Sequence, residues 1–186
     1  GQGNVTLRLG RQQPACGTVR LRMPGGCRGG YAVHVNSGHC KAPCEAGYLP
    51  ITREWADGDL ICIEFDMAPV AMMAHPQVMA DAGKVAVMRG PILYCAEEMD
   101  NGKLLHQLKI DLQRGFQCDW IDICGHRLLG VIAQGVRMNA HWANDAVLYA
   151  PYEHAEEPCV IHLIPYFAWG NRDQDRPREM RVFLHV

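Results

Sequence analysis

The densest group of metal-binding residue types lies at positions 39–44, where His39 stands directly before Cys40 and Cys44 completes a Cys-x3-Cys pair. Thiolate and imidazole are the ligands that zinc prefers, and a closed structural site takes about four of them. No second pair with matching spacing follows, so we prefer an unliganded loop over a zinc site. Further ligands would have to come from distant positions, namely His34, Cys27 or Cys16.

The remaining cysteines suggest packing rather than chemistry. Cys118, Cys124 and His126 form a weaker group of potential ligands. The chain holds 9 cysteines, an odd number, so they cannot all pair in disulfides. Cys62 and Cys95 lie inside apolar runs, where a small hydrophobic residue would fit. We therefore interpret the cysteines mainly as buried free thiols, which suit a reducing compartment.

Catalytic patterns are missing from the sequence. Nucleophilic catalysis needs a cysteine or serine beside a base, but 9 cysteines and 9 histidines allow so many chance pairs that none is specific. There is no Gly-x-Ser-x-Gly elbow, His-Glu-x-x-His motif, phosphate loop or dinucleotide fingerprint. Glu97 and Glu98 would point to opposite faces of a strand, unlike the facing carboxylates of a glycosidase, and we interpret both as solvated charges. The sequence assigns no catalytic, cofactor-binding or metal-binding residue.

Aromatic side chains offer a different chemistry, because tryptophan and tyrosine rings can stack on sugar rings. Core packing between sheets is the commoner use of such residues and is the interpretation we prefer. The residues concerned are Trp55, Trp120, Trp142, Trp169, Tyr48, Tyr152 and Tyr166.

The elements that would position these residues are strands. With 19 glycines and 11 prolines in 186 residues, few windows are long enough for a helix of several turns. Val19, Leu21 and Met23 alternate with Arg20 and Arg22, as in an antiparallel strand with one solvated face. The pattern predicts an all-β chain built as an antiparallel β-sandwich or jelly roll. Similar runs occupy positions 5–9, 18–23, 31–35, 60–67, 85–88, 92–96, 104–110, 120–123, 128–136, 146–150, 159–164 and 180–186.

Turn signals predict how the strands are connected. Asp57, Gly58 and Asp59 separate two strand-like runs, and an Asp-Gly pair favours the tight turn of a hairpin. The polar stretch 97–103 ends in Asn-Gly and is the best internal boundary. We expect two β-sandwich subdomains, at 1–100 and 101–186, with a long loop inside one sandwich as the alternative.

Charge and hydropathy exclude some classes of partner. Lys plus Arg (18) nearly balances Asp plus Glu (20), so no strong field favours nucleic acid or an anionic membrane. No apolar run approaches the roughly 20 residues that cross a bilayer. The N-terminus resembles a strand rather than a secretory leader, which predicts a cytoplasmic protein and suggests that the chain begins inside structure.

Several segments together resemble the C-terminal portion of glycoside hydrolase family 127, the β-L-arabinofuranosidase-type enzymes. They are 21–24 (LRMP) with 35–36 (VN), 47–59 (GYLPITREWADGD), 83–95 (GKVAVMRGPILYC), and 163–172 (LIPYFAWGNR) followed by Glu179 and Met180. Their order along the chain matches that of the family. The extra histidine and cysteines at 38–45 depart from it.

The resemblance implies an (α/α)6 barrel that carries catalysis, followed by two β-sandwich domains to which this chain would correspond. The family's zinc site, nucleophilic cysteine and acid/base glutamate belong to the barrel. No segment here matches those motifs, so no zinc or other cofactor is assigned to this chain. The resemblance also implies a strand-to-strand turn at 89–91, and places Tyr166 and Trp169 at a seam with the barrel or between the sandwiches.

We therefore expect a noncatalytic accessory region of a glycoside hydrolase. Its partner would be the catalytic barrel of the same parent protein, and it would support that barrel and a homodimer. One alternative is a carbohydrate-binding module, which would take a sugar ligand. A second alternative is an independent enzyme that depends on a cysteine or on zinc.

Overall fold

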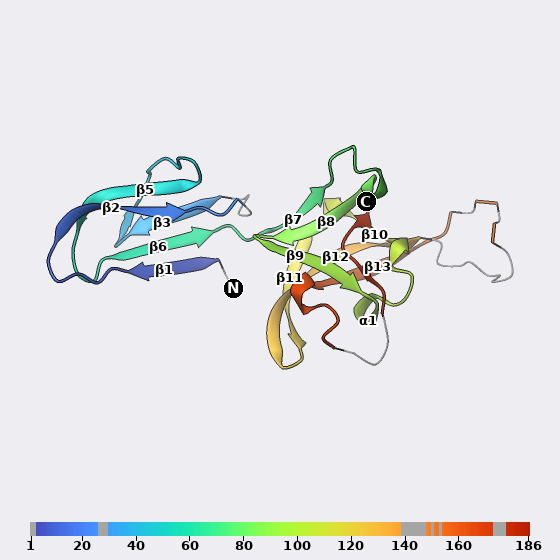
Figure 1. The fold of residues 1–186 in the computed structure, drawn as a ribbon. Coiled ribbons are helices and arrows are strands. Elements are labelled where there is room, and N and C mark those ends of the chain that lie inside the picture. Colours follow the sequence, from blue (N-terminus) through green and yellow to red (C-terminus); the bar gives the residue numbers. More distant parts are fainter. Residues whose placement is uncertain (1–2, 26–29, 139–147, 150, 153, 173–177) are drawn as a thin grey trace. The chain divides into compact units, whose positions relative to one another are not determined.

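The computed structural model describes residues 3–25, 30–138, 148–149, 151–152, 154–172 and 178–186. Strands make up most of these residues, which confirms the predicted all-β class (Figure 1). The chain divides into two compact units. The first consists of Gly1–Ala68 with Arg89–Pro91, and the second of Pro69–Met88 with Ile92–Val186.

The first unit is built from two antiparallel sheets. One has the strand order β1-β6-β3-β4 and the other pairs β2 with β5. The bounds are β1 (Asn4–Arg8), β2 (Ala15–Arg22), β3 (Tyr31–Val35), β4 (Gly38–His39), β5 (Tyr48–Trp55) and β6 (Leu60–Phe65). Both sheets contribute to one apolar core, made of Leu21, Met23, Val33, Val35, Leu49, Ile51, Trp55, Ile61 and Ile63. These facing sheets are the sandwich that the sequence predicts.

Strand β2 confirms the alternation seen in the sequence. Leu21 and Met23 are buried while Arg20 and Arg22 are exposed. Because successive side chains of a strand point to opposite faces, the leucine and methionine reach the core and the arginines reach solvent.

The turn after β5 forms, but the predicted hairpin is wrong. Gly58 has a φ of 82°, and the Asp59 carboxylate accepts the amide of Ala56 at 2.9 Å. Hydrogen bonds from Asn36 and from the Ala56 amide lower the pKa of Asp59 below its ordinary value. However, β5 pairs with β2, whereas β6 pairs with β1 and β3. The turn therefore carries the chain from one sheet to the other, because turn chemistry reverses the backbone without choosing the partner of each strand.

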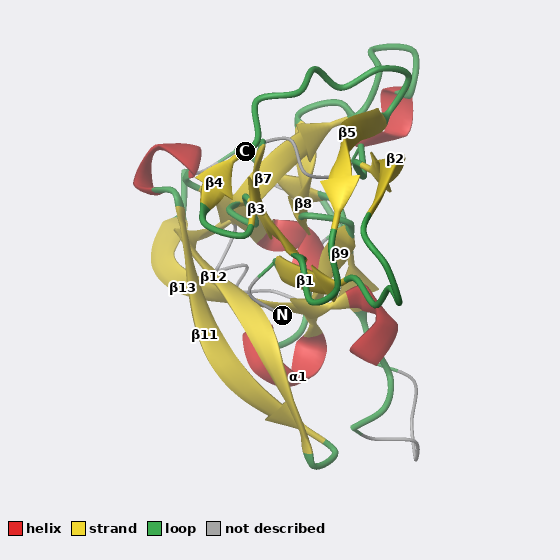
Figure 2. Ribbon diagram, turned by 90° about the vertical axis from the view of Figure 1, so that its left-hand side faces the viewer, coloured by secondary structure: helices red, strands yellow, loops and turns green. Residues whose placement is uncertain are grey.

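The second unit is one sheet of nine strands in the order β14-β9-β13-β12-β10-β15-β8-β7, with β11 paired to β12. Strand β8 also pairs with β9, which closes the strands from β9 to β8 into a ring. The bounds are β7 (Pro69–Met73), β8 (Lys84–Arg89), β9 (Ile92–Glu97), β10 (Leu108–Ile110), β11 (Phe116–Ile123), β12 (His126–Met138), β13 (Glu156–Pro165), β14 (Met180–Arg181) and β15 (Leu184–His185). Figure 2 shows the long strands β11, β12 and β13.

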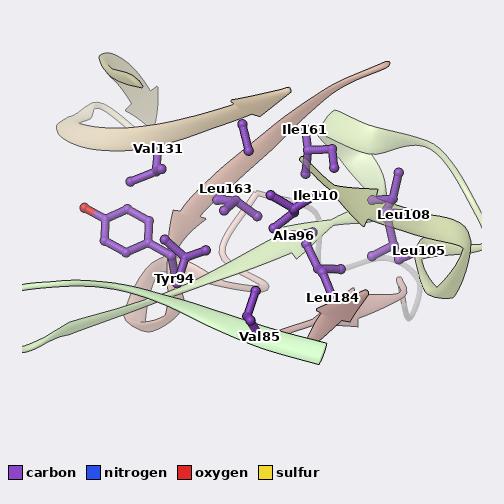
Figure 3. Close-up of a cluster of buried hydrophobic side chains, with 12 residues drawn as sticks. Val85, Tyr94, Ala96, Leu105, Leu108, Ile110, Val131, Ile161, Leu163 and Leu184 are labelled. Carbon is purple, nitrogen blue, oxygen red and sulfur yellow. The ribbon is translucent and has the colours of Figure 1, made fainter. Parts of the chain in front are cut away.

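Apolar side chains from around this ring fill its interior (Figure 3). The buried cluster consists of Val85, Val87, Tyr94, Ala96, Leu105, Leu108, Ile110, Val131, Ala133, Ile161, Leu163 and Leu184. The Tyr94 hydroxyl donates to the carbonyl of Leu129 at 2.9 Å, so its polar end is satisfied inside the apolar cluster.

The division between the units lies at residues 68 and 69 rather than at the expected 100 and 101. The polar stretch 97–103 lies inside the second unit, where it contains helix α1 (Glu98–Asn101). Asn101 binds β13 through its amide, because Nδ2 donates to the carbonyl of His162 at 2.8 Å and Oδ1 accepts the His162 amide at 2.9 Å. A polar composition therefore marks an anchored helix here and not a linker.

Other local expectations differ from the structure at particular positions. The run 104–110 begins with the 3-10 helix η2 (Leu105–Gln107) before β10, because Leu104 adopts a left-handed φ of 58°. Strand β7 lies outside the predicted runs, and most of the run 146–150 lies outside the described residues. In the part of the chain that is described, no helix has the length and apolar character needed to span a bilayer.

Candidate functional site

A buried ion cluster lies beneath the closing 163–172 segment. Arg172 donates to Glu97 Oε2 through Nε at 3.1 Å and to Asp100 Oδ1 through Nη1 at 2.8 Å, and its Nη2 binds both carboxylates. The amide of Gly170 donates to Glu97 Oε1 at 2.8 Å. The hydrogen bond to Asp100, and to a smaller extent the one to Glu97, raise the pKa of Arg172 above its ordinary value, although burial opposes this shift.

Glu97 is therefore not the solvated charge that the sequence suggests. It is 4% exposed, and its carboxylate is engaged on both oxygens. Glu98, at the start of α1, accepts the amide of Glu179 at 3.1 Å. Both glutamates bind the C-terminal part of the second unit, so they are structural groups rather than a facing catalytic pair.

The Glu179 carboxylate links the C-terminal part of the second unit to the start of η2. Its Oε2 accepts the amide of Leu105 at 2.9 Å, and its Oε1 accepts from Arg181 Nε at 3.3 Å. Burial would raise the pKa of Glu179, but these hydrogen bonds outweigh it and lower the pKa below its ordinary value. The carboxylate is thus held in its charged form.

Above this support lies an aromatic surface, formed by Tyr166, Phe167 and Trp169 around the 3-10 helix η4 (Tyr166–Ala168). The exposed fractions of these residues are 42%, 64% and 42%. The rings of Tyr166 and Trp169 are stacked, with centroids 6.2 Å apart and planes inclined by 23°. Large apolar side chains gathered on a held backbone are typical of a binding surface.

A pocket of about 600 Å³ adjoins the aromatic surface. The Cys124 thiol donates to the carbonyl of Asn171 at 3.0 Å and so ties the β11–β12 turn to the segment after η4. The Arg127 guanidinium lies 4.9 Å from the ring centroid of Trp120, which is itself exposed. The pocket is lined by Ile123, Cys124, His126, Arg127, Leu128, Phe167, Ala168 and Asn171.

The other aromatic candidates separate into core and surface. Trp55 is 2% exposed, and its Nε1 donates to the carbonyl of Gly17 at 3.0 Å, so it is a core residue as expected. Tyr48 is exposed and lies under Arg20, with 5.5 Å between the guanidinium and the ring centroid. Tyr152 is also exposed, and Trp142 lies outside the described residues.

The fold disperses the candidate metal ligands at 39–44. His39 lies opposite His34 in the β3–β4 hairpin, but Cys40 packs against the core on the other face. Cys44 hydrogen-bonds the Tyr31 hydroxyl, whose pKa is raised by burial first and then by this contact. Within the described ranges, no group of three or more His, Cys, Asp or Glu side chains is placed to hold a metal ion.

The more distant candidate ligands are also separated. Cys16 lies opposite Glu54 in the β2–β5 strand ladder, and Cys27 lies outside the described residues. Cys118 is on β11 and His126 opens β12, on the far side of the turn that contains Cys124.

The thiols are free in the described chain, but only some are buried. Cys95 is fully buried, and burial together with the nearby charge of Glu97 raises its pKa to about 12. Burial also raises the pKa of Cys159. Cys62 is only half-buried, and it lies on the outer face of its sheet opposite His34. The interpretation of the cysteines as mainly buried thiols therefore holds for Cys95. It is wrong for four cysteines that are exposed. Those are Cys16, Cys44, Cys118 and Cys124.

Comparison with protein families identifies both units. The family model described as "Glycoside hydrolase family 127 C-terminal domain" matches residues 69–185. The model described as "Beta-L-arabinofuranosidase, GH127 middle domain" matches residues 1–67. The junction between the two matches coincides with the division between the structural units.

Individual relatives are much longer than this chain. A non-reducing end β-L-arabinofuranosidase of Bifidobacterium longum subsp. longum is 37% identical over an alignment of 176 residues, and the match covers 88% of this chain and 25% of that protein. A GH127 β-L-arabinofuranosidase from Geobacillus stearothermophilus T6 has a crystal structure that matches with a TM-score of 0.89 and 34% identity over 99% of this chain and 28% of its own. The solved structure of another GH127 β-arabinofuranosidase matches with a TM-score of 0.83 and 29% sequence identity. This match covers 100% of this chain and 30% of the other one.

Proposed function

Because the chain belongs to glycoside hydrolase family 127, we propose that it is the noncatalytic accessory region of a β-L-arabinofuranosidase-type enzyme and that it supports a catalytic (α/α)6 barrel in the same parent protein. The observation that carries the proposal is the correspondence of its two units to the family's middle and C-terminal domains. The chain spans only about a quarter of the curated relative's length, which leaves room there for a separate catalytic domain.

The aromatic surface is the proposed contact with that barrel. Phe167 is the most exposed of its three residues, and the rings of Tyr166 and Trp169 stack on each other beside it in sequence. Beneath them, Glu97 holds the Gly170 amide and Arg172. An apolar surface on a fixed backbone loses little conformational entropy when it docks, which favours a permanent contact between domains.

The test of this contact uses the full-length parent protein. Phe167→Asp places a charge in the proposed interface, and Tyr152→Asp is the matched control at an exposed aromatic residue outside it. We expect Phe167→Asp to shorten the half-life of arabinosidase activity on heating, while Tyr152→Asp leaves it unchanged. Equal half-lives for the two variants would exclude the aromatic surface as the contact.

The accessory role itself is tested with the 186-residue chain. We expect no cleavage of an aryl β-L-arabinofuranoside by this chain. Cleavage would overturn the accessory role, and its loss after thiol blocking or chelation would favour the independent cysteine- or zinc-dependent enzyme. Sedimentation of the same sample determines whether the chain also forms the expected homodimer.

A carbohydrate-binding role is the second candidate. It is favoured by the pocket beside Phe167, where an exposed ring meets the polar side chains of His126, Arg127 and Asn171. Stacking on a ring together with a few hydrogen-bonding groups is how a protein site orients a sugar. Titration with arabino-oligosaccharides would support this role if tryptophan fluorescence saturates in the native chain and not in Phe167→Ala. No change in either chain would reject it.

A further inference from the structure

The outer face of the β1-β6-β3-β4 sheet carries a row of side chains that the accessory role does not use. Thr6 is opposite Cys62, Cys62 is opposite His34, and His34 is opposite His39. Directly opposed residues of antiparallel strands share a face. Val33 and Val35 flank His34 in sequence and point into the core, so this row faces away from it.

The two histidines are the closest kind of cross-strand pair. The amide of Cys40 donates to the carbonyl of Val33 at 2.7 Å, which makes Val33 and Cys40 a hydrogen-bonded pair. Pairs alternate along an antiparallel ladder, so the neighbouring pair of His34 and His39 is non-hydrogen-bonded, with Cα atoms about 4.5 Å apart. The imidazole centroids lie 5.2 Å apart, with the planes inclined by 76°.

The turn of this hairpin is held by the neighbouring strand. Asn36 has a left-handed φ of 55°, and its Nδ2 donates to Asp59 Oδ1 at 3.0 Å. Its Oδ1 accepts the amide of Leu60 at 3.0 Å. These bonds hold the turn between β3 and β4 against the start of β6.

The imidazole nitrogens are available for coordination. Within the described residues, the imidazole of neither His34 nor His39 makes a side-chain hydrogen bond or ion pair, and the two rings contact each other. Neutral imidazole binds Zn²⁺ and Ni²⁺ at about 2.0–2.1 Å, and side-chain rotation can turn one nitrogen of each ring toward a shared ion.

We propose that His34 and His39 chelate one divalent late transition-metal ion, such as Zn²⁺ or Ni²⁺, across the β3–β4 hairpin. Water completes the coordination. Cys62 stays outside the chelate, because it lies on the opposite side of His34 and its Sγ contacts Thr6 Oγ1 at 3.8 Å. The ion joins the edge strand β4 to β3 and so stabilises the edge of the sheet.

The test titrates the 186-residue chain with Ni²⁺ and measures heat of binding and melting temperature. His39 is exposed, so His39→Gln should fold normally, and His34→Gln is the partner variant. Even the loss of a group that only orients a ligand costs about tenfold or more in metal affinity, so we expect at least that loss in each variant. We also expect that Ni²⁺ raises the melting temperature of the native chain more than that of either variant.

Two control variants make the assignment specific. His75→Gln removes an exposed histidine from a turn elsewhere, and Cys62→Ser removes the neighbouring thiol. Both should retain the affinity of the native chain for Ni²⁺. Unchanged affinity in His39→Gln would overturn the proposal, and a loss in Cys62→Ser as large as that in His39→Gln would overturn the two-histidine assignment.

Discussion

Arg172 Nε donates to Glu97 Oε2 at 3.1 Å across 75 positions of the sequence. The pair joins the end of β9 to the segment that follows η4, and Asp100 shares the same guanidinium. The closing segment of the second unit is therefore held by charge as well as by apolar packing.

Replacing this arginine should be costly. In Arg172→Ala, the buried Glu97 and half-buried Asp100 lose their cation, and breaking a buried pair in this way costs about 3–5 kcal/mol. Urea unfolding of the 186-residue chain measures the loss. Arg114→Ala is the control, because its ion pair with Asp111 is largely exposed and should contribute less than about 1 kcal/mol. Equal losses in the two variants would contradict the buried cluster.

Alkaline pH should destabilise the second unit through Cys95. Its folded pKa of about 12 lies above the ordinary value of 9.0. A raised pKa contributes stability that is complete below the unfolded value and is lost as the pH rises toward the folded value. We expect the free energy of unfolding to fall over this interval, and to fall less in Cys95→Ala.

Alkylation checks the same thiol independently. At about pH 8, iodoacetamide should label the exposed Cys118 in the native chain and leave Cys95 unmodified until the chain unfolds, because the thiolate is the reactive form. Mass spectrometry of the peptides gives the two rates. Labelling of Cys95 at the rate of Cys118 would show that it is neither buried nor protonated.

Gly135 should not tolerate a side chain. A Cβ at this position would lie 2.1 Å from the carbonyl oxygen of Lys109 and 2.9 Å from Ile161 Cδ1. Gly135→Ala must therefore displace the β10 backbone, and overpacking of this kind costs about 1–3 kcal/mol in urea unfolding. Gly17→Ala is the matched control in strand β2, since the nearest atom to its Cβ would be Trp55 Cδ1 at 4.0 Å. A Gly135→Ala variant as stable as Gly17→Ala would be inconsistent with this packing.

The Tyr94 hydroxyl should contribute measurably inside the ring of strands. Tyr94→Phe keeps the buried ring but removes the donor to the Leu129 carbonyl, with an expected cost of about 1 kcal/mol. Thermal unfolding compares it with Tyr166→Phe, whose hydroxyl lies on the exposed aromatic surface and should have little effect. A larger loss in Tyr166→Phe would reverse this assignment.

The sequence predicts local conformation well where one strand carries its own signal. The alternation of Leu21 and Met23 with arginines identifies the buried face of β2 without knowledge of its partner. The positive φ of Gly58 also follows from residue type. Which sheet receives the chain after Gly58 does not, because that choice depends on the packing of distant strands.

Local sequence patterns do not predict the ion cluster that holds the backbone of the aromatic surface. Glu97 looks like one charge in a polar stretch, and its partner Arg172 lies far along the chain. The resemblance marked 163–172 as a unit, but no spacing rule connects it with Glu97. The resemblance likewise pointed to Tyr166 and Trp169. It did not predict that Phe167, which lies between them in sequence, is the most exposed of the three.

The division of the chain also constrains how the protein can be recombined. Residues 89–91 belong to the first unit although they lie inside the sequence of the second. Gly90 has a φ of 56°, and a Cβ there would lie 2.5 Å from Met67 Sδ. A cassette cut at residue 68 would therefore leave Met67 without the glycine that accommodates it. Exchange of the first unit between relatives should transfer two segments of the gene together.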